Sequence, residues 1–460
     1  MKPTDAKFIG EARPTQPVME IERHIALNVF WLAALCAISI YLAVSYASIG
    51  RPLWIDEFLH FALGSMPSTA QAWHTIQARM HDIYVGQTGG YQILDYWLLK
   101  LFGASPLWLR MPSIVSVLFM SAATAIFFHV RGFKPHWAFL AILALFCQIN
   151  LMYYGGEARP YMPLAAASVG VLAYYSVPHE ARRRWWPLGF IAIAWGCLMH
   201  AYFSIYWCAL AIFTYWEMQG FSLRRSTLKS FFHHCNFYLS AAGIAIYFGI
   251  GAATWMRSYP NFHLDPFFYT PRSYFFSAFF CDQFRVLVGY IGDPGLSILK
   301  WVCVSLPVVA LILIRCPKWR VIWAPLALIG LALALTTLLV LVSYCSHYWI
   351  LSRQWVASEA LCAIGVIWLA AEMAKELGRF ARQMEFACIL ALSILLVLRC
   401  IDARGQIALG RDIPHGPAPQ AVLVDKTKLP TSNDGWVAWA NANVASGGPV
   451  WPIFEKFFAK

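Results

Sequence analysis

Charged residues are scarce in this chain. Only 13% of its 460 residues are Asp, Glu, Lys or Arg, whereas soluble proteins carry about 25%. Apolar residues make up 60% and aromatic residues 16%, a composition that excludes a string of soluble domains. Segments of roughly 15 to 24 residues with almost no charge recur along the sequence, which is the length that crosses a hydrocarbon core of about 30 Å as a helix. The sequence therefore predicts an all-α polytopic membrane protein.

Cysteine motifs are missing as well. The chain has 12 cysteines but no CxxC pair, and most of them, such as Cys36 and Cys303, fall inside apolar segments. They are typical of small core residues rather than of disulfides or zinc ligands. The sequence also has no internal repeat and no low-complexity tract. Its formal net charge of +12 is explained by basic loops on the cytoplasmic side, so we expect no nucleic-acid partner.

Eleven apolar segments predict membrane-spanning helices. The first, 26–48, is too long for a signal-peptide core and is followed by no small-residue cleavage site, so it is interpreted as a retained anchor. Lys and Arg gather in the loops after the even-numbered spans, whereas the opposite short loops hold only Arg159 and Arg353. The positive-inside rule then places the N-terminus inside. The remaining spans are expected at about 112–130, 137–153, 161–177, 186–199, 201–217, 236–255, 295–314, 321–343, 355–371 and 386–400.

This topology divides the chain into three parts. Residues 1–24 form a cytoplasmic tail, residues 25–401 the transmembrane domain, and residues 402–460 a small C-terminal segment outside. Two loops on the outer face are substantial. The loop 49–106 places apolar residues at helical spacing around 56–66 and 92–102, which is typical of helices lying in the membrane interface. The loop 256–294 mixes charged and aromatic residues, as in a lid over a polar ligand.

Asp56 and Glu57 follow the first span and are the sharpest chemical feature. Two adjacent carboxyl groups at a membrane surface raise at least one pKa, so that one can act as a base while the other pairs with a cation. The alternative is that they cap the helix that follows. His60 shares their helical face. A divalent metal held by His60 and Asp56 is therefore left open, beside a packing role for the histidine.

Other polar residues map to the same leaflet by the charge rule. Glu157, Arg159 and Tyr161 lie in the turn between the third and fourth spans, where an arginine suits the binding of a phosphate group. The alternative for Glu157 and Arg159 is an ion pair within the loop. His200 lies between two spans, and Arg353 lies just before the tenth span. This convergence of acids, cations and histidines predicts a site on the outer face.

Five of these segments, in this order, resemble the GT-C glycosyltransferases related to protein mannosyltransferases and to the bacterial aminoarabinose transferase of lipid A. They are Asp56-Glu57, the segment Tyr96–Gly103 leading into Leu109–Ser113, the turn Glu157–Tyr161, His200 with an aromatic residue close behind it, and Arg353. The resemblance covers roughly residues 25 to 370.

The resemblance implies an inverting glycosyltransferase of the bacterial inner membrane. It would pass a sugar from a polyprenyl-phosphate carrier to an acceptor hydroxyl on the periplasmic side, and the acceptor is left open between lipid A or lipopolysaccharide, another glycolipid, a polysaccharide and a protein. Catalytic residues would be Asp56 as the base, with Glu57 and Glu157 orienting the acceptor or a cation. The donor phosphate would be bound by Arg159, Arg353, Tyr161, His200 and Lys100.

The sequence departs from the family in the turn before Tyr96. Family members usually carry a basic residue there, whereas this chain has Thr88, Gly89 and Gly90. The departure weakens aminoarabinose as the sugar and leaves Lys100 or Arg110 as substitutes for the missing cation. A transporter or lipid-carrier flippase is the alternative function. It would place charged residues near the middle of the membrane, whereas the centres of the predicted spans are almost uncharged.

Overall fold

The structure is a computed structural model. It describes residues 66–78, 87–103, 105–146, 148–221, 228–252, 322–346 and 355–376, together with residues 37, 38, 41, 57, 60, 63, 64, 383, 386, 389, 390, 393, 394, 397 and 401. The predicted segments 1–24, 256–294 and 402–460 lie outside these residues, as does the span 295–314. Asp56 and Arg353, two of the predicted site residues, also lie outside them.

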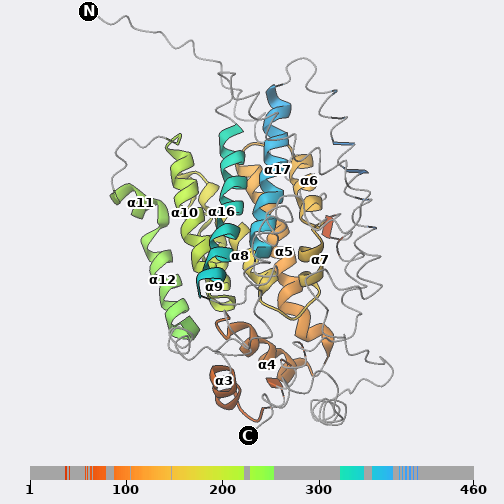
Figure 1. Ribbon diagram of the computed structural model, residues 1–460, viewed down its shortest axis with the longest axis vertical. Coiled ribbons are helices and arrows are strands. Elements are labelled where there is room, and N and C mark those ends of the chain that lie inside the picture. The colour runs from red at the N-terminus through yellow and green to blue at the C-terminus, as the bar shows by residue number, and fades with distance from the viewer. Residues whose placement is uncertain are drawn as a thin grey trace, which may run out of the picture.

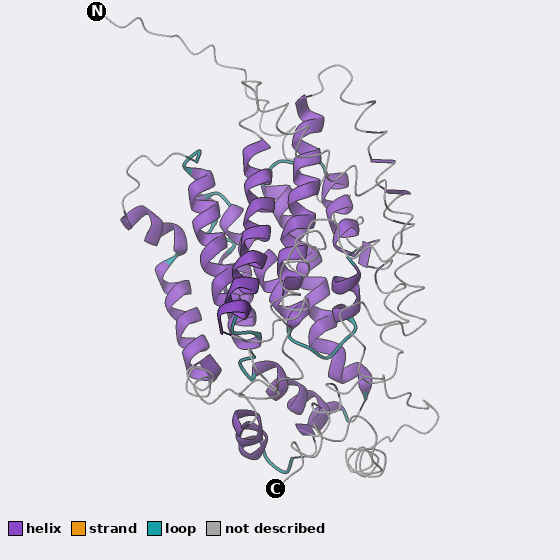
Figure 2. Cartoon of the chain, viewed as in Figure 1, coloured by secondary structure: helices purple, strands orange, loops and turns teal. Residues whose placement is uncertain are grey.

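The described part of the chain is helical and contains no strand (Figure 2). A single antiparallel β-bridge joins Gln87 to His200. Twelve α-helices are described: α3 (Thr69–Ala78), α4 (Gly90–Phe102), α5 (Pro106–Val130), α6 (Pro135–Phe146), α7 (Ile149–Gly155), α8 (Tyr161–Ser176), α9 (Trp186–Met199), α10 (Phe203–Met218), α11 (Leu228–Cys235), α12 (Phe237–Tyr247), α16 (Trp323–Ser346) and α17 (Val356–Glu376). Two short turns complete the set, the 3-10 helix η1 (His179–Ala181) and the π-helix η2 (Phe248–Ala252).

The long helices run side by side, and α3 and α4 lie across one end of this bundle (Figure 1). We call this the site end. Helices α5, α8, α10 and α17 begin there and α9 ends there, so segments far apart in the sequence meet at one place. Helix α8 lies in the middle of the bundle. It is buried from Tyr161 to Tyr175 and packs against α5, α9, α10 and α17.

Several predicted spans coincide with helices. The segments 161–177 and 186–199 match α8 and α9, and 321–343 and 355–371 match α16 and α17 within a few residues. Helix α5 begins six residues before the predicted 112, because the Ser105 side chain accepts a hydrogen bond from the Leu107 amide and Pro106 takes the first position. Pro112 lies inside this helix and does not end it.

The segment 137–153, predicted as one continuous span, is interrupted. Helix α6 ends at Phe146 and α7 begins at Ile149, with Gln148 in an extended conformation between them. Two helices, α3 and α11, were not predicted at all. Both are short, at 10 and 8 residues, and their sequences lack the long apolar segment from which the spans were recognised.

Two described helices are long and apolar enough to cross a membrane, Leu107–Val130 and Val356–Lys375. Four shorter apolar helices accompany them, at Pro135–Phe146, Trp186–Met199, Phe237–Ile250 and Trp323–Leu339. The predicted total of eleven spans, with its inside and outside faces, stays a prediction.

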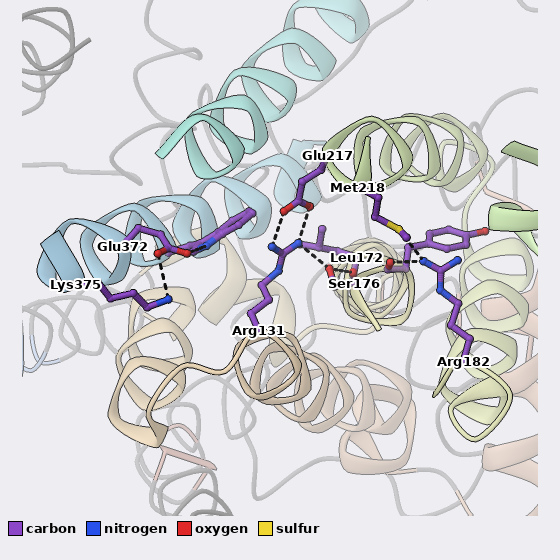
Figure 3. Close-up of polar contacts among 10 residues, drawn as sticks. Arg131, Leu172, Ser176, Arg182, Glu217, Met218, Glu372 and Lys375 are labelled. Atoms are coloured by element: carbon purple, nitrogen blue, oxygen red, sulfur yellow. Dashed lines mark hydrogen bonds and ion pairs between the residues drawn. The ribbon is translucent and has the colours of Figure 1, made fainter. Parts of the chain in front are cut away.

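Charged side chains at the opposite end of the bundle are engaged in contacts between helices (Figure 3). Arg131 forms a two-fold ion pair with Glu217, at 2.6 and 2.7 Å, and its guanidinium lies 4.0 Å from the centre of the Trp368 ring. Arg182 is buried and donates to the carbonyl oxygens of Tyr175 and Val177. Two of the basic residues that the charge rule assigned to the inner loops therefore also fasten helices together.

Candidate functional site

The site end gathers the predicted site residues that the structure describes. Glu57, His60, Glu157 and His200 have no exposed surface, and Arg159 and Tyr161 are each 3% exposed. They come from the segment before α3, from the turn between α7 and α8, and from the end of α9. Lys100 is different, because it lies on the exposed side of α4, 5.6 Å from the centre of the Tyr96 ring. The structure therefore brings six of these residues into one buried region and leaves Lys100 outside it.

Glu57 is held by a salt bridge that spans 53 residues of sequence. Its two carboxylate oxygens accept hydrogen bonds from Nε and Nη2 of Arg110, at 2.9 and 2.7 Å, and both side chains are fully buried. The backbone amide of Ala158 donates a third hydrogen bond to Glu57, at 2.9 Å. Glu57 thus fastens the segment before α3 to α5 and fixes the turn that carries Glu157 and Arg159.

His60 contacts an acid that was not among the predicted site residues. Its Nδ1 lies 2.5 Å from Oδ2 of Asp95 on α4, and both side chains are fully buried. Burial lowers the pKa of His60 to about 3, and the charge of Arg159 lowers it further than Glu57 raises it. Burial and the charge of Glu57 raise the pKa of Asp95 well above its usual value. Both groups are therefore driven to their neutral forms, with Asp95 donating its carboxyl hydrogen to His60.

Arg159 is linked to the same region through Tyr91 and Ser113. The Ser113 hydroxyl donates to the backbone oxygen of Arg159 at 3.1 Å and lies 3.0 Å from the Tyr91 hydroxyl. The rings of Tyr91 and His60 pack edge to face, with their centres 5.6 Å apart. The Arg159 guanidinium lies 5.6 Å from the centre of the Tyr161 ring. The backbone of Arg159 is therefore anchored on α5, and its charge acts on the surrounding imidazoles.

His200 forms the far side of this region. Its Nδ1 accepts a hydrogen bond from the Tyr202 amide at 3.2 Å, and its ring lies 5.8 Å from the Tyr161 ring. Burial, and after it the charge of Arg159, lower the pKa of His200 to about 3. His200 is thus neutral at physiological pH. Because Nδ1 accepts a hydrogen bond, the ring hydrogen lies on Nε2.

Helix α4 buries one face and exposes the other. Gln92 and Asp95 are fully buried together with the apolar Tyr91 and Leu99, whereas Trp97, Leu101 and Phe102 are 45%, 67% and 54% exposed. Two polar side chains on the buried face and three large apolar side chains on the exposed face are unusual for a helix on a soluble protein. A helix that covers a polar site with one face and lies against lipid with the other would have such a pattern. That 92–102 lies in the membrane interface stays a prediction.

The turn of Thr88, Gly89 and Gly90, at the start of α4, packs closely against the end of α9. Gly89 has a φ of 87°, a conformation that favours glycine. A Cβ atom on Gly90 would lie 2.1 Å from the backbone oxygen of Leu198 at the end of α9, and the Thr88 hydroxyl donates to that same oxygen. Thr88, Gly89 and Gly90 therefore allow the start of α4 to pack closely against the end of α9. A longer basic side chain in this turn would contribute nothing to that contact.

A metal ion was one reading of Asp56 and His60. Among the described residues no group of three or more His, Cys, Asp or Glu side chains is arranged to hold one, and Nδ1 of His60 is engaged by Asp95. Because Asp56 lies outside the described residues, the metal site stays a prediction.

Sequence reasoning missed the positions of Arg110, Asp95 and Asn150. The amide of Asn150 donates to Glu359 on α17 at 2.6 Å, so a second buried acid is held near the start of that helix. A signal for Asp95 was present, because an acid in an otherwise apolar helix with Gln92 one turn before it marks a polar face. Arg110 was considered only as a donor-phosphate ligand, whereas the structure shows it paired with Glu57.

Comparisons with known proteins give the following similarities. No family model and no curated protein matches the chain. A crystal structure of ArnT from Cupriavidus metallidurans in the apo state is similar with a TM-score of 0.49 and 15% identity, covering 90% of this chain and 69% of that one. A structure of the same protein bound to undecaprenyl phosphate has a TM-score of 0.44 and 14% identity, covering 82% and 74%. ArnT is the lipid A aminoarabinose transferase, a member of the family that the motifs resemble. Residue roles in this chain rest on its own contacts.

Proposed function

We propose that this chain is an inverting glycosyltransferase of the bacterial inner membrane. It transfers a sugar from a polyprenyl-phosphate carrier to an acceptor hydroxyl on the outer face. The observation that supports this function best is the buried region at the site end. There Arg159 lies among Glu57, His60 and His200, which come from two other parts of the chain. The family resemblance of the motifs points to the same reaction.

In the proposed chemistry a carboxylate acts as the base and arginines stabilise the departing phosphate. Asp56 accepts the proton of the acceptor hydroxyl as its oxygen attacks the anomeric carbon of the sugar. The bond from that carbon to the carrier phosphate breaks on the opposite side, so the configuration inverts. The departing phosphate gains negative charge, and Arg159 and Arg353 stabilise it. The acceptor is a hydroxyl of lipid A or lipopolysaccharide, another glycolipid, a polysaccharide or a protein.

The contacts of Arg159 support its place in this scheme. Its backbone is fixed by Ser113, and the turn that carries it is fixed by the hydrogen bond from Ala158 to Glu57. A cation held by rigid neighbours stabilises developing charge without the cost of reorganisation. Glu57, in turn, has its charge compensated by Arg110. We therefore propose that Glu57 orients the turn and that Glu157 is the acid that meets the acceptor or a cation.

The distribution of charge in the described helices disfavours the transporter alternative. Helices α6, α8, α9 and α16 contain no Asp, Glu, Lys or Arg, and in α5 and α17 the charged residues lie near the helix ends. Transporters usually place charged or polar groups along a path near the middle of the membrane. The described core of this chain offers no such path, and its charges gather at the two ends of the bundle.

The test is transfer by the purified full-length protein in liposomes. Polyprenyl-phosphate sugars and a panel of the four acceptor classes are supplied, and the sugar attached to each acceptor is measured. We expect transfer by wild type and a loss of about 100-fold or more in Asp56→Asn. Glu180→Gln, on an exposed turn at the opposite end, is the matched control and keeps wild-type transfer. Equal turnover in wild type and Asp56→Asn removes Asp56 as the base.

A second measurement tests the proposed role of Arg159 in binding the carrier phosphate. Binding of the bare carrier, polyprenyl phosphate, is measured for wild type and Arg159→Gln. The transferase requires that wild type binds the carrier and that Arg159→Gln binds it more weakly. If wild type does not bind the carrier and transfers no sugar to any acceptor, the proposed function is rejected.

A further inference from the structure

Three of the buried polar atoms at the site end, with no hydrogen-bond partner in the described structure, lie along one chain of contacts. They are Oε1 of Gln92, Oδ1 of Asp95 and Nε2 of His200, and all three side chains have no exposed surface. Leaving a buried polar atom without a partner is costly, so such atoms are uncommon away from functional sites. The proton transfer and phosphate stabilisation proposed above rest on Asp56, Arg159 and Arg353, and only the family resemblance assigned His200 to the donor phosphate.

The three side chains belong to one connected patch. Gln92 and Asp95 lie one turn apart on the buried face of α4. The Gln92 amide donates to the Gln87 side chain, and the backbone of Gln87 pairs with that of His200. The other ends of these side chains are therefore fixed by the protein: Gln92 by Gln87, Asp95 by His60, and His200 by the Tyr202 amide. Only the atoms named above are left over.

The hydrogen-bonding character of the patch follows from these contacts. Oε1 of Gln92 is an acceptor. With Asp95 donating its hydrogen to His60, its Oδ1 is a carbonyl-type acceptor, and Nε2 of His200 carries a hydrogen and is a donor. A ligand that satisfies the patch must offer two donors and an acceptor. Sugar hydroxyl groups offer both.

The positive charge of Arg159 favours a neutral hydroxyl over a charged amine in this region. The Glu57 carboxylate is compensated by Arg110, and Asp95 is paired with His60. The Arg159 guanidinium lies 5.6 Å from the centre of the Tyr161 ring, and the centre of that ring lies 5.8 Å from the centre of the His200 ring. The charge of Arg159 disfavours the protonated forms of both His60 and His200. The same field disfavours the ammonium group of an amino sugar, because it too is a cation in the same region.

We propose that Gln92, Asp95 and His200 form a recognition patch for the hydroxyl groups of a neutral sugar on the carrier, and that it selects such a sugar over an amino sugar. This inference rests on the proposed function, since the ligand is the sugar of the polyprenyl-phosphate donor. It assigns a specificity to the donor site, for hydroxyl groups over an ammonium group.

The experiment measures binding of three probes to the full-length protein in liposomes. The probes are bare polyprenyl phosphate, polyprenyl phosphate carrying a neutral pentose, and the same donor with one hydroxyl replaced by an amine. We expect wild type to bind the neutral donor more tightly than the bare carrier and more tightly than the amine. Wild type that prefers the amine overturns the inference.

Variants test the patch through the ratio of neutral-donor affinity to bare-carrier affinity. Gln92→Met and Asp95→Leu each remove one acceptor and should lower this ratio about three- to tenfold. Asp95→Asn restores most of the loss, because its amide repeats the geometry of the neutral acid. The matched control is Gln148→Met, which changes another buried glutamine whose Oε1 has no partner, at the junction of α6 and α7. Its ratio should equal that of wild type.

The ratio keeps folding and function apart. A variant that fails to fold loses the bare carrier as well, and His200→Leu, which removes the donor instead of an acceptor, then provides an independent measurement. If the variants of Gln92, Asp95 and His200 all keep the wild-type ratio, ordered water satisfies these atoms and the inference is wrong. That outcome leaves the transferase standing, whereas absence of binding to the bare carrier rejects the proposed function itself.

Discussion

Removing the guanidinium of Arg110 should strongly destabilise the site end, because the ion pair with Glu57 is fully buried. In Arg110→Met the side chain keeps much of its apolar length but leaves Glu57 without its cation. Glu57 and Arg110 are both fully buried, and two of the three hydrogen bonds described for Glu57 come from Arg110. The third of these hydrogen bonds comes from the Ala158 amide, and a neutral amide compensates a buried carboxylate less than a guanidinium does.

The magnitude follows from the burial of the pair. Removing one partner of a buried ion pair costs about 3–5 kcal/mol, because an uncompensated charge stays inside the protein. Replacing both partners by neutral groups costs much less. Glu57→Gln combined with Arg110→Met should therefore recover about 2 kcal/mol or more of the loss in the single variant. The turn that holds Arg159 should loosen along with Glu57, so binding of polyprenyl phosphate should weaken in the single variant.

The assay is reversible unfolding of the purified protein in mixed micelles, with the free energy of unfolding measured for wild type, both single variants and the double variant. Arg131→Met is the matched control, because Arg131 also makes a two-fold ion pair but is 15% exposed and lies at the opposite end. It should cost less and leave carrier binding unchanged. If the two single losses simply add in the double variant, Glu57 and Arg110 are not coupled and the reasoning is wrong.

Two further predictions concern packing and pH. Gly90→Ala should destabilise the protein by about 1–3 kcal/mol, because its Cβ would clash with the Leu198 backbone oxygen. Gly330→Ala on α16 is the control, and it should be neutral or stabilising because nothing lies within 4 Å of its Cβ. Equal free energies of unfolding for the two variants would contradict this prediction. The pKa of His200 is about 3 in the folded chain, below its ordinary 6.5, so the unfolded chain binds more protons between these values and stability falls as pH decreases. Wild type should lose about 2 kcal/mol more than His200→Gln between about pH 7 and about pH 5, and parallel pH profiles of the two unfolding free energies would refute it.

Long apolar segments made much of the helical framework predictable. Helices α8 and α9 begin at the predicted residues because the apolar segment, the preceding polar residues and a proline near the start act together. The break between α6 and α7 was not predictable, since Gln148 is one polar residue within an apolar segment and the choice to leave the helix depends on tertiary packing. The same dependence hid α3 and α11.

The candidate site divides in the same way. Residue type and topology were enough to predict that Glu57, Glu157, Arg159 and His200 lie at the same end of the helix bundle. They were not enough to say which acid meets which cation. The Glu57–Arg110 pair joins residues 53 apart, and the contact between His60 and Asp95 joins residues 35 apart. Neither spacing falls on one helix, so no periodicity in the sequence carries the pairing.

These pairings change what the acids can do. Before the structure, Glu57 and His60 were the natural partners of Asp56, one as a second carboxylate and the other as a shared ligand. Each is instead committed to a buried contact with Arg110 or Asp95. An acid whose charge is compensated, and an imidazole whose Nδ1 is occupied, hold the segment before α3 in place. We therefore keep Asp56 as the proposed base and Arg159 and Arg353 as the proposed phosphate ligands, and substitution of Glu57 should lower stability before it changes the chemistry.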